Sequence, residues 1–550
     1  MPGHVASRGP ETSRRQFLRV GGAGVSLAAL APLLAACGSS GGSSSSASSQ
    51  GMIRWGIQQE PDTLDAQQTA LSASWQILQY LGNSIIHRNL KDQNLAGLAK
   101  SWTANADSTV FEFTLEPGAV FHDGTPFDAR ALDFTFQRGL DPATKSPIFP
   151  SQVGTVKKTT VVNSTTYRIE LEQPYGPVID NFGANGGSWL QPLSAQAVKK
   201  YGSSYGRNPV STGPWKFEEW ETGQYLLFSS FSPFRYGPQY LKNTGAPYVK
   251  QLKLVVTPED SSRVAALQAG ELDFAPVPAS SLAQIKGNPG ITVIRQLQKG
   301  MGLCIHFNFN VPPFNDVNVR KAMFLAVDRQ EIVNVVLQGQ GMPAYGPLPP
   351  GFPYYWAGVE KIGYPYDPRQ AAALLDAAGW RMGANGVRAK NGVPFKFNIL
   401  VIDSPTIVQA AQLVQAQYKQ VGIDLNLQTQ DISAINPELF AHNFQLTFMF
   451  WTDTDPDILY REFDSSQING GVNWGSYSNP ELDKYLRAGR ATADPGARAA
   501  AYQKAQQLMV EQAVWLPIYA QYDLTAVRKV LTGAVMHPDG YMLLDDARLS

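Results

Sequence analysis

Apolar and polar side chains alternate in several short segments of the chain, which is the pattern of strands that bury one face. The clearest alternation runs through Ile53, Trp55 and Ile57 and stops at the turn-forming residues 60–63. Similar alternation recurs at residues 111–115, 167–171, 303–309, 397–401, 423–427 and 446–450. The sequence therefore predicts half-buried strands along most of its length.

Helical segments are interleaved with these strands, and their ends carry recognisable signals. Asp367 and Pro368 open one helix, since Asp caps helix N-termini and proline fits the first turn, and Gly379 closes it. Further helices with apolar faces or similar start signals are expected at residues 316–327, 404–422 and 479–486. Because strands and helices that alternate predict a sheet with helices on its faces, the expected fold class is α/β.

The first candidate site residues lie in two loops, one inside residues 396–451 and one that begins where this stretch ends. In α/β sheets, ligands bind just beyond the carboxyl ends of strands. Asp403 and Ser404 follow the first strand of this stretch, and residues 451–457 follow its last strand. The sequence therefore places a candidate ligand site at these two loops.

The second of these loops contains three acids, Asp453, Asp455 and Asp457, which allow two interpretations. They could form the turn itself, since Asp favours caps and turns. They could instead hold an ammonium group in a partly desolvated site, where charge-assisted hydrogen bonds are strong. Asp457 is the acid most expected to be structural.

Aromatic residues in loops are further candidates. Trp474 and Tyr477 lie in a loop, where either packing or ligand contact would explain them. The turn after the first strand adds Asp62 and Thr63. The candidate ligand-binding residues are therefore Asp62, Thr63, Asp403, Ser404, Trp451, Thr452, Asp453, Asp455, Trp474 and Tyr477.

The N-terminal segment has the pattern of an export signal. Arg14 and Arg15 precede an apolar run of about 15 residues, which is too short to span a membrane. The paired arginines resemble a twin-arginine signal, and the Leu-Ala-Ala-Cys that ends at Cys37 resembles a bacterial lipobox. An ordinary basic segment and a small residue near a cleavage site are the alternative. The prediction is a signal peptide at 1–36.

A Gly/Ser-rich segment follows Cys37 directly. Residues 38–50 are glycines and serines with one alanine and one glutamine, so they cannot bury apolar surface and should form a flexible tether. We therefore expect a lipidated cysteine and tether at 37–51. The mature protein would be exported and lipid-anchored on the extracytoplasmic face of the cell membrane.

Composition narrows the functional classes. A chain of 550 residues is too long for one core, so several domains are expected. Its 45 basic residues match its 45 acidic residues, and nucleic-acid binding is not expected without a basic excess. Two cysteines exclude a disulfide framework and a four-cysteine zinc site. The six histidines have no close metal-ligand spacing, so no metal or cofactor is expected.

Catalytic patterns are nearly absent. The chain has one Gly-x-Ser-x-Gly match, at residues 202–206, with Ser204 in the nucleophile position. A nucleophile elbow needs a strand before it and a helix after it, whereas the residues before this match look helical. We therefore predict no catalytic residues, and a secreted serine hydrolase that uses Ser204 is a remote alternative.

Several short motifs occur in a characteristic order. The first group is LAKSW at 98–102, FEFTL at 111–115, VFHDGTPF at 120–127 and ALDFTF at 131–136. The second group is STGPWKF at 211–217, AALQAGELD at 265–273, PFNDVNVRKA at 313–322, AVDR at 326–329, YDP at 366–368 and AGW at 378–380. Over residues 52–530 this order resembles the extracellular solute-binding protein family 5. These are the peptide/nickel-type binding proteins of ABC importers.

The resemblance implies a two-lobed periplasmic-binding-protein-like fold of type II, with an extra subdomain on lobe one and a hinged ligand cleft. The implied function is to capture oligopeptides or a peptide-like solute and to deliver them, as a monomer, to an ABC transporter permease and ATPase. The implied limits are 52–88, 205–305 and 516–550 for lobe I, 89–204 for the subdomain and 306–515 for lobe II. A sensor for a non-peptide solute, such as a sugar or metal chelate, is the alternative function.

The resemblance also bears on the ligand. Relatives commonly hold a peptide amino terminus with an acid three positions after the tryptophan that corresponds to Trp451. Here Thr454 takes that position, and Asp453 and Asp455 flank it. Dipeptide-selective relatives use an arginine near residues 401–405, where this chain has none. Longer peptides or a non-peptide solute therefore stay open.

Overall fold

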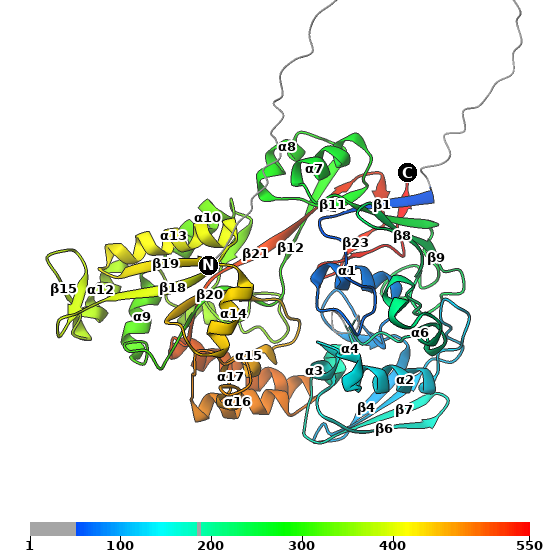
Figure 1. Cartoon of the computed structure of the whole chain (residues 1–550), viewed down its shortest axis with the longest axis horizontal. Helices are drawn as coiled ribbons and strands as arrows, with labels where there is room; N and C mark the ends of the chain where they lie inside the picture. The colour runs from blue at the N-terminus through cyan, green and yellow to red at the C-terminus, as the bar shows by residue number, and fades with distance from the viewer. Residues whose placement is uncertain (1–50, 184–188) are drawn as a thin grey trace, which may run out of the picture. The chain divides into compact units, whose positions relative to one another are not determined.

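A long mixed sheet organises the computed structural model, which describes residues 51–183 and 189–550 (Figure 1). The strand order is β19-β18-β20-β13-β21-β11-β1-β10-β9-β8, and β12 and β14 also pair with β21. The strands are β1 (Met52–Ile57), β8 (Trp215–Glu221), β9 (Tyr225–Ser230), β10 (Gln251–Val256), β11 (Phe274–Pro276), β12 (Ile291–Leu297), β13 (Met301–Phe307), β14 (Gly341–Pro343), β18 (Lys396–Ile402), β19 (Asp424–Gln430), β20 (Leu446–Trp451) and β21 (Trp515–Arg528).

One strand, β21, belongs to both halves of this sheet. Its residues 515–519 pair with β13, and its residues 522–528 pair with β12. The short segment 298–300 joins β12 to β13 beside it. Two strand-like connections therefore link the half-sheet around β1, called here the lobe I sheet, to the half-sheet around β18 and β20, the lobe II sheet.

The predicted lobe limits can be compared with this pairing. The strand partners change near residue 300 and near residue 520, and the limits that the family resemblance implies lie at 305/306 and 515/516. The alternation of side chains continues through a strand that passes from one half-sheet to the other. A sequence pattern therefore does not mark where the partner changes.

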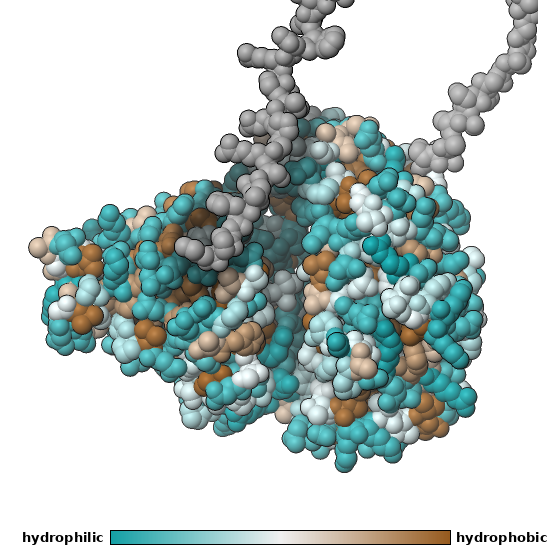
Figure 2. Space-filling view, in the orientation of Figure 1, coloured by the Kyte–Doolittle hydropathy of each residue, from teal (hydrophilic) through white to brown (hydrophobic). Residues whose placement is uncertain are grey.

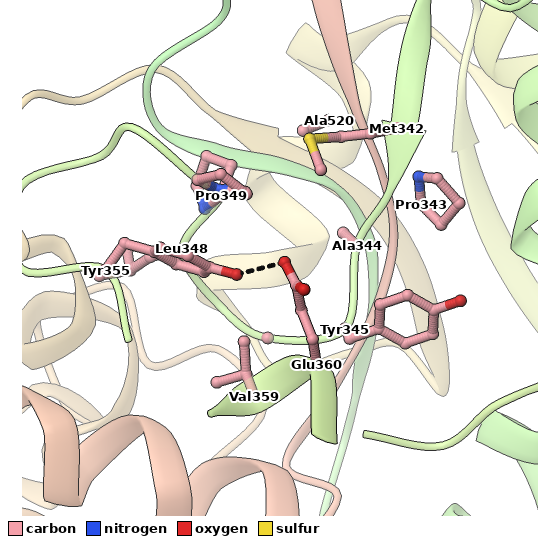
Figure 3. A pocket seen from close by; sticks show the side chains of 12 residues that line it. Met342, Pro343, Ala344, Tyr345, Leu348, Pro349, Tyr355, Val359, Glu360 and Ala520 are labelled. Atoms are coloured by element: carbon pink, nitrogen blue, oxygen red, sulfur yellow. Dashed lines mark hydrogen bonds between the residues drawn. The ribbon is translucent and has the colours of Figure 1, made fainter. Parts of the chain in front are cut away.

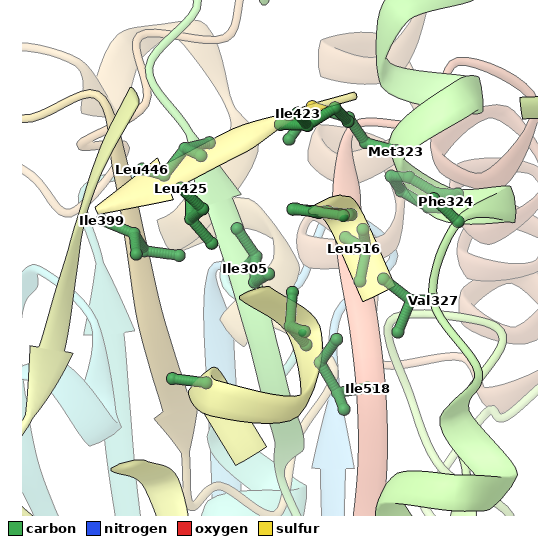
Figure 4. Close-up of a cluster of buried hydrophobic side chains, with 14 of the residues drawn as sticks. Ile305, Met323, Phe324, Val327, Ile399, Ile423, Leu425, Leu446, Leu516 and Ile518 are labelled. Atoms are coloured by element: carbon green, nitrogen blue, oxygen red, sulfur yellow. The ribbon is translucent and has the colours of Figure 1, made fainter. Parts of the chain in front are cut away.

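Helices cover the lobe II sheet, as the sequence predicts for an α/β fold. They include α9 (Val317–Leu325), α10 (Arg329–Val336), α12 (Pro368–Ala377) and α13 (Pro405–Gln420). Strands β18 and β19 are parallel, as are β18 and β20. The core between sheet and helices is aliphatic and aromatic (Figure 4), and it includes Ile305, Met323, Phe324, Val327, Ile399, Ile423, Leu425, Leu446, Leu516 and Ile518.

The lobe I sheet has its own core. Ile53, Trp55, Leu252 and Leu254 are buried there against α1 (Ser72–Leu81) and neighbouring loops. A second cluster lies under α7 (Asp260–Ala269) and includes Val264. Each half-sheet therefore buries its own set of apolar side chains.

A third core belongs to residues 86–183, called here the small-sheet region. Its four-stranded sheet has the order β4-β5-β7-β6. Its buried side chains include Phe111, Phe113, Tyr167 and Ile169, from strands that the sequence predicts. The elements are β2 (Ile86–Arg88), β3 (Asn94–Ala96), β4 (Ala99–Ala104), β5 (Val110–Leu115), α2 (Ala129–Leu140), α3 (Phe149–Val153), β6 (Val156–Asn163), β7 (Thr166–Leu171) and α4 (Val178–Phe182).

The remaining elements are shorter or lie toward the C-terminus. They are α6 (Ala195–Tyr201), η3 (Gly202–Arg207), α8 (Leu282–Lys286), α11 (Val359–Ile362), β15 (Arg381–Met382), β16 (Arg388–Lys390), β17 (Val393–Pro394), α14 (Ile432–Phe440), α15 (Ile458–Phe463), α16 (Pro480–Arg490), α17 (Pro495–Glu511), β22 (Leu531–Thr532), β23 (Val535–Met536), β24 (Met542–Leu543) and β25 (Arg548–Leu549). Three further short 3-10 helices lie at 142–144, 279–281 and 465–467.

The end signals act as predicted, with one difference. Asp367 accepts hydrogen bonds from the backbone N–H groups of Arg369 and Gln370 at the start of α12. Strand β13, expected to reach Phe309, ends at Phe307. The cause is Asn308, whose side-chain amide donates to the carbonyls of residues 442 and 444 and turns the chain.

Hydrophilic residues predominate on the face shown in Figure 2. No helix among residues 51–183 and 189–550 combines the length and the apolar character that a membrane crossing needs. The predicted signal peptide, Cys37 and nearly all of the tether lie outside the described residues.

Candidate functional site

A cavity of about 170 Å³ lies where β13, β20 and β21 meet the start of α13. Two residues that the sequence singles out, Ser404 and Trp451, line it together. The lining residues are Gln298, Lys299, Gly300, Met301, Gly302, Leu303, Ser404, Thr406, Ile407, Phe450, Trp451, Tyr519, Ala520 and Gln521. The cavity therefore lies at the carboxyl ends of β18 and β20, directly beside the connections between the half-sheets.

The position of the cavity follows from two close backbone approaches. Gly300 has φ of 122°, and a Cβ there would lie 1.9 Å from the carbonyl oxygen of Trp451. A Cβ on Gly302 would lie 2.1 Å from the carbonyl oxygen of Tyr519. Both positions therefore need glycine, because a side chain would push β13 away from its two neighbours.

The first turn of α13 borders this cavity. Ser404 has extended backbone geometry at the N-cap, and its hydroxyl makes no capping hydrogen bond. Pro405 occupies the first turn, and the next two residues, Thr406 and Ile407, both line the cavity. N–H groups in a first helical turn lack partners within the helix and carry partial positive charge, so they suit oxygen atoms of a ligand.

Lys299 is the charged residue that lines the cavity. It is 8% exposed, and its ammonium pairs with Asp92 of the small-sheet region and, at 2.8 Å, with Asp539. Burial alone would raise the pKa of Asp539, but the Lys299 ammonium holds this pKa below its ordinary value. Sequence reasoning missed Lys299 because it lies in a three-residue connection without periodicity or motif.

The apolar wall of the cavity is formed mainly by buried strand residues. Met301, Leu303 and Tyr519 are almost fully buried. Phe450 is 47% exposed and presents its ring at the end of β20. Hydrocarbon surface and a few fixed polar groups are together typical of sites for small organic ligands.

Each acid of the loop after β20 has its own arginine partner. The pairs are Asp453 with Arg461, Asp455 with Arg498 at 2.7 Å, and Asp457 with Arg490 at 2.7 Å. Asp453 also accepts the N–H groups of Thr454 and Asp455, at 2.7 and 3.1 Å, so it forms the turn. The turn-forming interpretation of this loop is thus seen directly, and residues 452–457 are called the acid loop below.

Asp455, the main candidate for an ammonium partner, is held within the protein. It is 4% exposed and does not line the cavity, and its Oδ1 accepts from Arg498 and from the backbone N–H of Asp457. Burial raises its pKa, and the Arg498 guanidinium opposes this rise. A role for Asp455 in binding a ligand amine stays a prediction. In this structure the guanidinium of Arg498 already occupies the position of its cationic partner.

The loop aromatics lie behind the cavity. Trp474 stacks on Trp451 with ring centroids 5.3 Å apart, and Phe440 packs edge-on against it at 5.6 Å. Tyr477 packs against Phe309 at 4.7 Å. Trp474 and Tyr477 are buried and do not line the cavity, and Trp474 supports it through its stacking on Trp451.

The other candidates organise turns or lie exposed. Asp62 accepts hydrogen bonds from Thr69 at 2.7 Å and Ser74 at 2.6 Å, while the hydroxyl of Thr63 accepts from a backbone N–H two residues on. Thr452 and Asp403 are exposed. None of these four candidates lines the cavity.

Three other features offer less chemistry. Ser204 is exposed on η3, which follows α6 rather than a strand, so the surroundings of a nucleophile elbow are missing there. Cys304 is fully buried and its thiol donates to the carbonyl of Met449 at 3.0 Å. Within residues 51–183 and 189–550, no three His, Cys, Asp or Glu side chains are placed to hold a metal ion.

A second hollow is too small for a ligand. It lies between residues 342–350 and 355–360 and has a volume of about 10 Å³ (Figure 3). The hydroxyl of Tyr355 donates to Glu360 across it at 2.6 Å. A space of this size holds a water molecule at most.

The chain was compared with known proteins. Residues 95–471, more than half of the chain, match the family model "Bacterial extracellular solute-binding proteins, family 5 Middle". The glutathione-binding protein GsiB of Salmonella paratyphi A is 28% identical over 483 residues, which cover 86% of this chain and 88% of that protein. GsiB of Escherichia coli O157:H7 is 27% identical over 480 residues, with the same coverage.

Solved structures share the fold. HbpA2 of Haemophilus parasuis superimposes with a TM-score of 0.78 at 24% identity, over 91% of this chain and all of that chain. The oligopeptide-binding protein AppA of Bacillus subtilis, solved with a nonapeptide, gives 0.72 at 24% identity over 91% and 99%. The expected two-lobed periplasmic-binding-protein-like α/β fold is confirmed. The chain belongs to the bacterial extracellular solute-binding proteins of family 5.

Proposed function

We propose that this protein is the substrate-binding component of an ABC importer, which captures an oligopeptide or a peptide-like solute and delivers it to a membrane permease. The observation that carries the proposal is the cavity beside β21 and residues 298–300. Its walls join Trp451 and Ser404 of the lobe II sheet to Lys299, whose ammonium is tied to Asp92 and Asp539 on the other side. A solute there would contact the elements that connect the lobes.

The cavity suits one part of an extended ligand. Whole sites for small organic ligands typically measure about 300–1,000 Å³, so a space of about 170 Å³ would hold one side chain or chain end. The N–H groups at the start of α13 would serve carbonyl or carboxylate oxygens of a peptide backbone. Glutathione, named for the GsiB relatives, and longer peptides, as named for AppA, both carry such groups.

The proposal extends to the location of the protein and to its chemistry. We propose export through the twin-arginine-like signal, lipid attachment at Cys37, and a monomer tethered to the outer face of the cell membrane by residues 38–50. The family comprises solute-binding proteins, and we propose that this member also releases its ligand chemically unchanged.

Native mass spectrometry of the freshly purified protein tests the proposal first, since a co-purified solute would appear as an added mass. Calorimetric titration with reduced glutathione and with tri- and pentapeptides then ranks ligands. Thr406→Trp, which fills the cavity, should weaken binding at least about tenfold. Gln409→Trp, at an exposed position of the same helix, is the control. Equal binding by both variants would place the ligand elsewhere, and a chemically altered ligand would contradict the proposed function.

A further inference from the structure

The acid loop and the small-sheet region are joined by a buried chain of charges. Arg498 of α17 is 1% exposed and contacts two carboxylates, Asp455 of the acid loop at 2.7 Å and Asp180 of α4. Asp180 in turn contacts Arg88 of β2 at 3.5 Å and accepts the side-chain amide of Asn94 at 2.7 Å. The contacts therefore run from the lobe II side into the small-sheet region through side chains that are buried or, for Asp180 at 17% exposed, mostly buried.

Backbone contacts accompany this ionic chain. The N–H of Gly176 donates to the carbonyl of Arg490 at 2.7 Å, and the N–H of Ala493 donates to the hydroxyl of Ser108 at 2.8 Å. A Cβ on Gly176 would lie 1.8 Å from the carbonyl oxygen of Thr492. The turn between α16 and α17 therefore lies directly on the small-sheet region, and Figure 1 shows these helices beside α3 and α4.

The charges of this contact balance across it. Asp180 faces the guanidiniums of Arg498 and Arg88, which hold its pKa below its ordinary value although burial alone would raise it. Asp455 forms its ion pair with Arg498, and the nearby Asp180 carboxylate adds to the rise in its pKa that burial causes. Removing one member of a buried ionic group leaves the others without compensation in a medium of low dielectric, which is strongly unfavourable. Moving the acid loop away from the small-sheet region would also leave these charges without their partners, and this is unfavourable until water solvates them.

We propose that Arg498 with Asp180 and Asp455 forms a clasp that holds the lobes closed, so Asp455 is a positioning residue for the acid loop rather than the partner of a ligand amine. This inference rests on the proposed function, because a clasp needs lobes that open and close. When the lobes open, Asp180 leaves Arg498 and the two backbone hydrogen bonds break. Trp451, which precedes the acid loop, would then be less firmly held at the cavity.

Hydrogen exchange of the full-length protein without added ligand tests the clasp. In Asp180→Asn, which keeps the shape and the Arg498–Asp455 pair, the amides of Gly176 and Ala493 should exchange roughly tenfold faster or more, as expected when a charged hydrogen bond is lost. Gly176→Ala should have the same effect by a steric route, without a change of charge. Asp376→Asn, which alters an Asp–Arg pair within lobe II, is the matched control.

The outcomes separate the clasp from alternatives. Unchanged exchange at Gly176 and Ala493 in both variants would overturn it. A uniform increase that also includes β13 and β18 would overturn it as well, since the pair would then support folding rather than closure. Because no ligand is added, failure of glutathione or peptides to bind leaves this test valid and contradicts only the proposed function.

A ligand experiment tests the role of Asp455. The probes are the pentapeptide Ala-Ala-Phe-Ala-Ala and its N-acetylated form, titrated into the wild-type protein and Asp455→Asn. If Asp455 belongs to the clasp, the substitution weakens both probes by the same factor. A loss confined to the peptide with the free amine would overturn this assignment and make Asp455 a ligand-binding residue.

Discussion

At the scale of single residues, the site depends on buried charges that are matched inside the protein. Lys299 lies between two carboxylates, and every acid of the acid loop has an arginine. From the sequence, the acids after β20 could be named as candidate site residues, because they follow a buried strand. The sequence could not indicate their partners, since Arg498 is more than 40 residues away and its pairing depends on how α17 packs.

The Lys299 contact predicts a pH-dependent stability. Lys299→Met should lower the free energy of unfolding by about 3–5 kcal/mol at pH 7, because it leaves Asp539 buried without its cation. The folded pKa of Asp539 is lowered, so its stabilising contribution exists above the unfolded pKa and disappears as pH falls through the folded value. The difference between the two proteins should therefore shrink below about pH 4.

Urea unfolding between pH 3 and 8 measures this difference. Lys299→Arg keeps the positive charge and is the control, with a much smaller effect expected. A difference between Lys299→Met and wild type that is constant over the whole range would contradict the ionic origin of the stabilisation.

At the scale of elements, the fold could largely be predicted and the cavity only partly. Helix α12 begins after Asp367 and β20 covers the predicted 446–450, because caps and alternation are local signals. The cavity arises from the approach of β13 to β20 and β21, which the chain achieves with Gly300 and Gly302. Neither glycine has a sequence neighbour that reveals this contact. Of the candidates named from the sequence, Ser404 and Trp451 line the cavity together.

A pair of glycine variants tests the close contact between β13 and its neighbouring strands. Gly300→Ala should destabilise the protein by about 1–3 kcal/mol more than Gly386→Ala, because its Cβ collides with a backbone oxygen and β13 must shift. Gly386 also has positive φ, 78°, but lies in open space, so it controls for backbone strain alone. Denaturant midpoints give the comparison, and equal losses would show that the close approach contributes nothing.

At the scale of the whole molecule, family membership explains the order of the motifs. The motifs at 98–136 now lie in the small-sheet region and its helix α2, around one core. Because β21 is one continuous strand with two sets of partners, the alternation of its side chains does not mark where one half-sheet ends and the other begins.

The anchor can be tested in cells. Cys37→Ser should leave the folded protein free of the membrane, because the lipid chains attached at this cysteine would supply the membrane affinity. Fractionation followed by immunodetection measures the release, and unchanged binding of glutathione or peptides by the soluble variant shows that it is folded. A variant that still sediments with membranes would contradict lipid attachment at Cys37.

The continuous strand β21 also constrains how the polypeptide matures. The N-terminal lobe lacks a central strand of its sheet until residues 522–528 have left the ribosome, although its first strand was synthesised some 470 residues earlier. A nascent chain must therefore keep an incomplete apolar surface from aggregating during nearly its entire synthesis. A premature stop codon just before residue 515 would remove β21 and so damage both lobes at once, including the lobe whose first strand is synthesised earliest.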